Sequence, residues 1–488
     1  MMARLSFAPL IALALTGCVS LAPERQDPAV VAAMPESFSA ARMAGEHQPA
    51  AWWRDFGDPV LDRLVEHALA DNLDIAQAAA RAERAAAQAR VARAGLAPSI
   101  EASAGSSYSD APLTGSSFGS FPGAPSRLTN ESYSLGLAAS YELDLFGRVR
   151  NDFDAARLEA RASDYDYNAV RLATAAETIS AYFDIVDARF QIENALLALD
   201  VLGDRAEQTE DRYRRGLAQS FELYQVRQDL RSTEAGLPQR ENTLDSAETR
   251  LTGLLALYPE ASGEVLGATL LPRLVFEDVP AGLPADLLSQ RPDVAAAWDR
   301  LEAARLRIGA RKAERYPRVS LSASTGSQGG VPQDAFDIGE NWLLSLASNI
   351  VAPIFDNGRI SANIAAARAT YDESAAAYGA AVLGAYNEAN LAIAAYERQR
   401  ARYRLILAQR DEAQSTLDLQ ARRFEAGVGD YVGYLDALRA FYQVESSLSA
   451  AGRDVALARL GVHRALGGDW EMDNADVAAG QSGEGVVK

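Results

Sequence analysis

The chain has 488 residues, 48% of them hydrophobic, and a formal net charge of −19. This length allows several domains or one extended architecture. The acidic balance argues against a nucleic-acid partner and against a polybasic contact with anionic lipid. The mean hydropathy is −0.12, and the sequence has no apolar run of the ~18 to 20 residues that a membrane-spanning helix needs. A chain of this kind would have to cross a membrane with strands.

Residues 1–17 have the pattern of a secretory signal peptide. Arg4 precedes an apolar run from Leu5 to Leu15, which is too short to span a bilayer. The run leads into Leu-Thr-Gly-Cys, ending at Cys18, and this resembles the bacterial lipobox, whose cysteine is lipidated and becomes the mature N-terminus. Val19 follows it instead of the aspartate associated with inner-membrane retention, which favours the outer membrane. A chance cysteine behind an ordinary signal peptide is the alternative.

Cys18 is the only cysteine in the chain, so no intramolecular disulfide can form. Residues 18–50 contain Pro23, Pro28, Pro35 and Pro49, and we expect them to form an irregular tether between a lipid and the folded part.

The remainder of the chain reads as two repeats. Gly216 and Gly427 each end a predicted helix and precede a new one, and they stand 211 residues apart. Earlier landmarks, such as Pro98 and Pro317, are 219 residues apart. We therefore assign residues 51–257 and 285–468 to two structural repeats, each a helix, two strands, a long helix and a helix. A proline-bearing linker at 258–284 would form a belt, and the acidic tail at 469–488 is expected to be disordered.

Each repeat changes from helical to alternating periodicity after its proline. Segments beginning at Ile100, Tyr133, Val319 and Trp342 place apolar residues at every second position, with small or polar residues between them. The segments between the paired strands, at 107–132 and 326–341, are rich in Gly, Ser and Pro and read as exposed loops. Such strands suit a membrane barrel, but a soluble antiparallel sheet with one wet face has the same alternation.

Long helices are predicted at 148–213 and 359–424. The first contains no proline, and its apolar residues recur at alternating steps of three and four, as in a coiled-coil seam. The seam consists of Ala169, Leu172, Ala176, Ile179, Phe183, Val186 and Phe190. The second helix is richer in alanine, which would let neighbouring helices approach closely.

The sequence offers little for catalysis. His47, His67 and His463 are its only histidines and are too scattered for a metal cluster. A phosphate-binding glycine loop, a G-x-S-x-G elbow and a cysteine pair are all absent. We interpret the chain as non-enzymatic, without a metal or a cofactor.

In this order of elements the chain resembles the outer membrane factor family, the TolC/OprM-like exit ducts of bacterial efflux pumps. The resemblance rests on AWWRDFGDPVLDRLVEHALADNLDI, SQRPDVAAAWDRLEAARLRIGARKAERYPRVSL, PIFDNGRISANIAAA, the tip around Gly427 and ALGGDW. It implies a mixed α/β membrane protein in which three chains each give four strands to a twelve-stranded barrel, continued by an α-helical coiled-coil tunnel in the periplasm. It also implies a homotrimer that works with a periplasmic adaptor and an inner-membrane pump of the RND type.

The resemblance also implies a gate at the periplasmic end, formed by a ring of apolar, acidic and arginine side chains. These map onto Val432, Asp436 and Arg439. An ordinary i, i+3 helix pair is the alternative for Asp436 and Arg439. TolC-type members use a tyrosine and an arginine where this chain has Phe424 and Gly429, so that polar network is missing here.

The tips at Gly216 and Gly427 are expected to meet the adaptor, although simple helix ends would also require these glycines. As a whole the sequence predicts an outer-membrane lipoprotein that passively conducts substrates to the cell exterior. Two alternatives share parts of this pattern. One is an exit duct for type I protein secretion, and the other is a periplasmic lipid-anchored scaffold without a pore.

Overall fold

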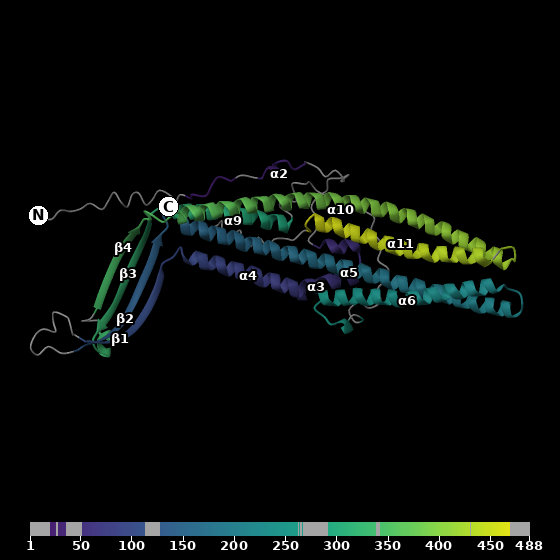
Figure 1. Cartoon of the computed structure of the whole chain (residues 1–488), viewed down its shortest axis with the longest axis horizontal. Coiled ribbons are helices and arrows are strands. Elements are labelled where there is room, and N and C mark those ends of the chain that lie inside the picture. The colour runs from purple at the N-terminus through teal and green to yellow at the C-terminus, as the bar shows by residue number, and fades with distance from the viewer. Residues whose placement is uncertain are drawn as a thin grey trace, which may run out of the picture. The chain divides into compact units, whose positions relative to one another are not determined.

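The computed structural model describes residues 20–25, 28–35, 51–112, 127–261, 263, 266, 291–337, 342–429 and 431–468. In chain order (Figure 1), its elements are α2 (Ala29–Ala32), η2 (Trp52–Phe56), α3 (Pro59–Asp71), α4 (Leu73–Ala94), β1 (Ser99–Pro112), β2 (Arg127–Leu143), α5 (Arg148–Arg214), α6 (Ser220–Leu254), η4 (Pro259–Ala261), α9 (Pro292–Ala313), β3 (Arg318–Gly329), η6 (Pro332–Phe336), β4 (Trp342–Val351), α10 (Arg359–Glu425) and α11 (Tyr431–Ala465). The predicted signal peptide, Cys18, most of the 258–284 belt and the 469–488 tail lie outside the described residues.

The chain divides into two compact units. The first unit comprises residues 1–27, 83–162 and 298–377, and the second comprises residues 28–82, 163–297 and 378–488. The boundaries between them fall within α4, α5, α9 and α10. None of the helices in the described part of the chain is both long enough and apolar enough to cross a membrane.

The first unit contains a four-stranded antiparallel sheet in the order β1-β2-β3-β4 (Figure 1). Its register confirms the alternation in the sequence, because residues paired across the four strands have side chains of the same kind. Ile100, Ala139, Ala323 and Leu346 form one row, and the adjacent row on the opposite face begins at Glu101 and contains Ala138, Ser324 and Ser345. One face is therefore mainly apolar, and the other is mainly small or polar, with Leu343 as an exception.

The strands extend further than the predicted loops allowed. β1 continues to Pro112 and β2 begins at Arg127, so the 107–132 loop was assigned too widely. Likewise, β3 continues to Gly329, and η6 occupies part of the 326–341 segment. Ladder hydrogen bonds override the turn composition here, since Ser and Gly are tolerated in a strand whose backbone groups are paired. Arg127 also donates to Asp110 at 2.8 Å near the end of this extension.

Among the described residues, η6 packs against part of β2 and β3, and most of both faces of the sheet is left uncovered. Every described residue of β1 and of β4 is exposed. The apolar side chains on these strands are open to a similar extent, with Ile100 at 74% and Leu346 at 75% exposed. An uncovered apolar area of this kind marks a surface that contacts something other than water.

The long helices match each other in length. α5 and α10 have 67 residues each, and α6 and α11 have 35 residues each. Both pairs start 211 residues apart, whereas α4 and α9, with 22 residues each, start 219 residues apart. The predicted helices at 148–213 and 359–424 are confirmed to within one residue. The central seam residues Leu172, Ala176, Ile179, Phe183 and Val186 are buried, as the heptad spacing requires.

One predicted helix is in fact two. The segment between Pro59 and Pro98 breaks at Asn72, which separates α3 from α4. The Asn72 side chain accepts hydrogen bonds from the backbone N–H groups of Asp74 (2.9 Å) and Ile75 (3.1 Å), so it caps α4. Its amide nitrogen donates to the carbonyl of Leu254 at the end of α6 (2.9 Å). This one side chain therefore provides hydrogen-bond partners for N–H groups at the start of α4 and for a carbonyl at the end of α6.

The core of the second unit is built around η2, α3 and the middle of α5. Trp52, Leu61, Ile179 and Tyr182 are fully buried in it. Asp58 caps α3 by accepting from the N–H of Val60 (2.8 Å), and it also accepts the Tyr182 hydroxyl. Burial, together with this bond, raises the pKa of Tyr182, so the hydroxyl remains a donor.

His463 belongs to the same core. Its ring stacks on Trp52 with centroids 5.0 Å apart, and its side chain is 1% exposed. Burial, and secondarily the charge of Arg459, lowers the pKa of His463 to about 3. The folded protein therefore holds this imidazole neutral, whereas the unfolded chain protonates it below pH 6.5.

Acid should consequently destabilise the second unit through His463. The folded-state pKa is depressed, so stability is lost as pH falls below the unfolded value, by about 2 kcal/mol between pH 7.5 and pH 5. Thermal unfolding midpoints are measured by circular dichroism at pH 7.5 and at pH 5. We expect the difference between these two midpoints to be smaller in His463→Phe than in the wild type, because phenylalanine does not titrate. His67→Gln is the control, because the His67 side chain is 36% exposed, and it should leave the difference unchanged. An equal acid sensitivity in His463→Phe would contradict this assignment.

Candidate functional site

Both helical tips of the second unit end in the same backbone motif. Gly216 and Gly427 have φ of +71° and +74°, in the left-handed region that glycine adopts without strain. Each glycine N–H bonds back three residues, and the following N–H bonds back five, to Arg212 at 2.8 Å in one tip and to Arg423 at 3.0 Å in the other. This is the Schellman arrangement, which satisfies the last carbonyls of α5 and α10. The two glycines are therefore helix caps, as the simpler interpretation required.

Near these tips, contacts with aromatic rings join the α5–α6 hairpin to the α10–α11 hairpin. Phe424 of α10 stacks on Tyr434 of α11, with ring centroids 5.9 Å apart. Two arginines of α5 lie over these rings, Arg212 at 5.6 Å from Phe424 and Arg205 at 4.9 Å from Tyr434. Each such cation–π contact is worth on the order of 0.5–1 kcal/mol at a partly exposed site. Phe424 thus has a packing role in this chain, at the position where TolC-type members have a tyrosine.

The predicted gate residues share one face of α11. Val432, Asp436 and Arg439 follow at steps of four and three, and the buried residues Leu435 and Leu438 lie beside this face. Val432 is half-buried, and the Asp436 side chain is 61% exposed. Arg439 donates to Asp436 at 2.8 Å, so the i, i+3 pair is formed. The face can present a carboxylate outward, with its charge partly balanced.

Arg439 has a second partner that the sequence did not reveal. Its guanidinium donates to Asp229 of α6, with 3.0 Å between Nε and Oδ2. Asp229 has no carboxylate counterpart in the second half, where the residue 211 positions later is Ala440. Asp229 could therefore not be predicted as a partner of Arg439, either from the internal repeat or from a sequence motif. The contact links α6 to α11 and fixes the arginine in place.

The α5–α6 hairpin is also held by charge at its tip. Glu210 accepts from Arg227 (2.8 Å) and from Arg214 (2.5 Å). The hydrogen bond from Arg227 is the main cause of a lowered pKa at Glu210. This exposed cluster determines how the two helices meet, and it contributes little to stability because water screens it.

The lipidation candidate Cys18 lies outside the described residues, but the segment that follows it is seated on the first unit. Ser20 donates to Asn151 of α5 at 3.0 Å, and Arg305 of α9 donates to the carbonyl of Pro23 at 3.0 Å. Arg25 lies 3.9 Å from the centre of the Trp298 ring. The start of the tether is therefore a docked strap and not a free linker.

Gly309 makes room for this strap. A Cβ at Gly309 would lie 2.7 Å from the nitrogen of Ala22 and 2.9 Å from Nδ2 of Asn151. Glycine inside a helix costs about 1 kcal/mol relative to alanine. The close approach of the strap explains why α9 carries a glycine there.

In the part of the chain that the structure describes, no group of three or more His, Cys, Asp or Glu side chains could hold a metal ion.

Comparisons with known proteins agree on one family. The pattern of the outer membrane efflux protein family matches residues 64–257 and 283–468. The outer membrane protein OprJ of Pseudomonas aeruginosa is 32% identical over 473 residues, covering 95% of each chain. The probable outer membrane lipoprotein SilC of Salmonella typhimurium is 29% identical, covering 93% of this chain and 96% of its own. The open-state structure of the Neisseria gonorrhoeae MtrE outer membrane channel superposes with a TM-score of 0.80 at 27% identity, over 92% and 98% of the two chains.

The seat of the tether gives a direct test. Gly309→Val should displace Ala22 and loosen the strap around Arg25, because a branched side chain cannot share the space with the strap. We expect faster tryptic cleavage after Arg25, measured by mass spectrometry of timed digests. Gly203→Val is the control, since a Cβ at Gly203 of α5 meets nothing within 4 Å. Equal cleavage rates in the two variants would show that the strap does not depend on Gly309.

Proposed function

This chain belongs to the outer membrane efflux protein family and is the outer-membrane component of an efflux pump, and from this premise we propose that three copies assemble into one passive duct. The observation that supports the assembly is that the two edge strands of the sheet have unpaired sides. β1 and β4 each have one neighbouring strand among the described residues, so each has an edge of unpaired backbone groups. Such edges are very costly in lipid, and membrane barrels start at about eight strands. Three chains of four strands would close a barrel of twelve.

The two faces of the sheet fit this assembly. The apolar face carries exposed Leu137, Leu344 and Ile350, which suit contact with lipid. The opposite face carries Ser103, Ser140, Ser322 and Asn349, which suit a water-filled interior. Trp342 begins β4 and Tyr141 lies near the end of β2, where interfacial aromatic girdles would be. The same scheme makes the helices of both repeats, which would derive from an internal duplication, the wall of a periplasmic tunnel.

Partners follow from the duct. A passive conduit needs an inner-membrane transporter, which we propose is of the RND type, to supply the free energy. A periplasmic adaptor would join the two at the tips around Gly216 and Gly427. No catalytic group is needed, because the duct makes and breaks no bond. Selection of the cargo would lie with the pump.

We propose that Cys18 carries the lipid that anchors each chain to the outer membrane. The docked strap at residues 20–25 supports this, because it would hold the lipidated end close to the first unit. A lipid gives attachment, whereas a closed barrel gives passage. The lipid anchor would therefore assist insertion of the chain into the membrane, and the barrel strands would hold the chain there.

The gate would be formed by the exposed face of α11. With threefold symmetry, three Asp436 carboxylates would surround one narrow lumen, and like charges at close range repel. Arg439 offsets part of this charge, since it is hydrogen-bonded to both Asp436 and Asp229. The ring should favour cations, and Val432 should keep the resting aperture tight.

The assembly is tested by native mass spectrometry of the detergent-extracted protein. We expect a particle of three chains, because only a closed sheet satisfies the strand edges. A monomer that stays stable in detergent would eliminate the pore, and a dimer or tetramer would refute the proposed strand count.

The gate is tested by recordings in planar bilayers. Asp436→Ala should lower cation selectivity, because it removes the carboxylate ring. Val432→Ala combined with Arg439→Ala should raise the resting conductance, because it removes both the apolar constriction and the cross-links to Asp229 and Asp436. Asp411→Ala is the matched control, since the Asp411 side chain on α10 is 66% exposed.

Unaltered selectivity in Asp436→Ala and unaltered conductance in the double variant would place the constriction elsewhere. If Asp411→Ala changed selectivity as much as Asp436→Ala, the effect would reflect overall charge and not a ring at this position.

A further inference from the structure

A cleft whose wall is formed mainly by charged and polar residues lies within the second unit, along the line where α5 faces α6. Its volume is about 640 Å³, and Arg453 of α11 contributes to its wall. On α6, Arg240, Thr243 and Arg250 recur at steps of three and seven, so they share the face that lines the cleft. Pro238 lies at the same level and leaves one backbone hydrogen bond of α6 unmade. The gate residues do not line this cleft, and the proposed duct has no use for it.

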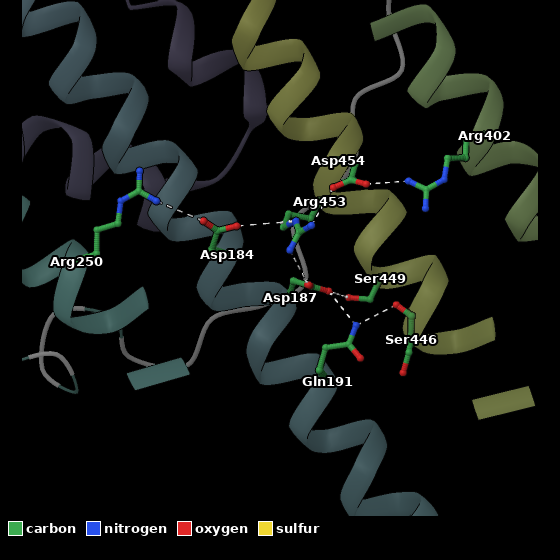
Figure 2. Close-up of polar contacts among 9 residues, drawn as sticks. All are labelled: Asp184, Asp187, Gln191, Arg250, Arg402, Ser446, Ser449, Arg453 and Asp454. Carbon is green, nitrogen blue, oxygen red and sulfur yellow. Dashed lines mark hydrogen bonds and ion pairs between the residues drawn. The ribbon is translucent and has the colours of Figure 1, made fainter. Parts of the chain in front are cut away.

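The acidic side chains of the cleft are already engaged by arginines (Figure 2). Asp187 accepts from Arg453 at 3.2 Å and from Ser449 at 2.6 Å. Asp184 lies between Arg250 (3.6 Å) and Arg453 (3.8 Å). Burial raises the pKa of Asp184, and the charges of Arg453 and Arg250 oppose this effect.

The charges that line the cleft do not balance. Two carboxylates, Asp184 and Asp187, face three guanidinium groups, Arg240, Arg250 and Arg453. Asp454 also bonds to Arg453 (3.0 Å), but Arg402 bonds to it at 2.8 Å and compensates it (Figure 2). One positive charge is therefore in excess at this place, in a chain whose net charge is −19.

Arg240 carries the excess charge. Among the described residues it makes neither a hydrogen bond nor an ion pair. Its guanidinium folds back over Gly236, where a Cβ would lie 2.6 Å from Nη1. Arg240 also lines a second cavity of about 310 Å³ further along the same helices. An arginine has five donors in a planar fork that matches a carboxylate or a phosphate, and here all five are available.

We propose that this cleft is a binding site for a small polar organic anion, whose carboxylate or phosphate group pairs with Arg240. Its size falls in the range of ligand pockets, which is about 300–1,000 Å³. The wall also contains Gln191, Gln239, Thr243 and Ser246, whose side-chain oxygen atoms can accept hydrogen bonds from a hydroxylated solute. Arg250 is a weaker second contact, because Asp184 already attracts it.

Isothermal titration calorimetry of the full-length protein in detergent tests this site, with citrate and inorganic phosphate as probes and glycerol as the neutral comparison. Buffers are free of carboxylate and phosphate and low in salt. We expect saturable binding of one citrate or phosphate per chain and none of glycerol. Arg240→Gln should weaken binding at least tenfold, with an unchanged helical circular dichroism spectrum. A response to citrate alone would assign a carboxylate ligand, and a response to phosphate alone a phosphorylated one.

Arg231→Gln is the matched control. Arg231 lies on the same helix, is 77% exposed and pairs with Glu234 outside the cleft. Its replacement should leave the affinity unchanged. The proposal is overturned if wild-type protein shows no saturable binding up to about 10 mM, where even a millimolar site would be filled. It is also overturned if Arg240→Gln binds like wild type, or if Arg231→Gln weakens binding equally. The site does not rest on the trimer, so its failure would leave the proposed duct intact.

Discussion

The unpaired edges of the four-stranded sheet are the constraint from which the rest follows. Backbone N–H and C=O groups along the outer sides of β1 and β4 must find partners, and lipid offers none. A single chain of this family cannot bend so short a sheet into a closed cylinder. In the proposed trimer, exposed apolar residues such as Ile100 and Leu346 would be covered by lipid.

Much of this architecture could be predicted from the sequence, because it rests on periodicity. The alternation after Pro98 and Pro317 located the strands, and the absence of proline from 148 to 213 located α5. Strand ends were less predictable. Ser, Asp and Pro at 107–112 suggest a loop by composition, whereas the pairing partner that makes this segment a strand is supplied from 127–132. Local composition cannot reveal which partner a backbone will find.

The helical tip shows a second limit of sequence reasoning. The spacing of Val432, Asp436 and Arg439 predicted a shared face, and they share one in the structure. Asp229 could not be predicted, because a carboxylate on a charged helix has no signature until its partner is known. The break at Asn72 was missed for a similar reason, since the asparagine is stabilised by the carbonyl of Leu254, 182 positions away. In each case the decisive partner is distant in sequence.

The matched helices constrain how such a chain can evolve. One residue inserted into α5 alone would turn everything beyond it by about 100° and shift it by about 1.5 Å. Arg205 and Arg212 would then leave the rings of Tyr434 and Phe424, and the two tips would lose their registration. Insertions are tolerable only if they come in helical repeats and in several helices at once. The eight residues by which the offsets 219 and 211 differ fall between α4 and α5, where the first pair of strands is longer than the second, so that length changes there without turning a helix.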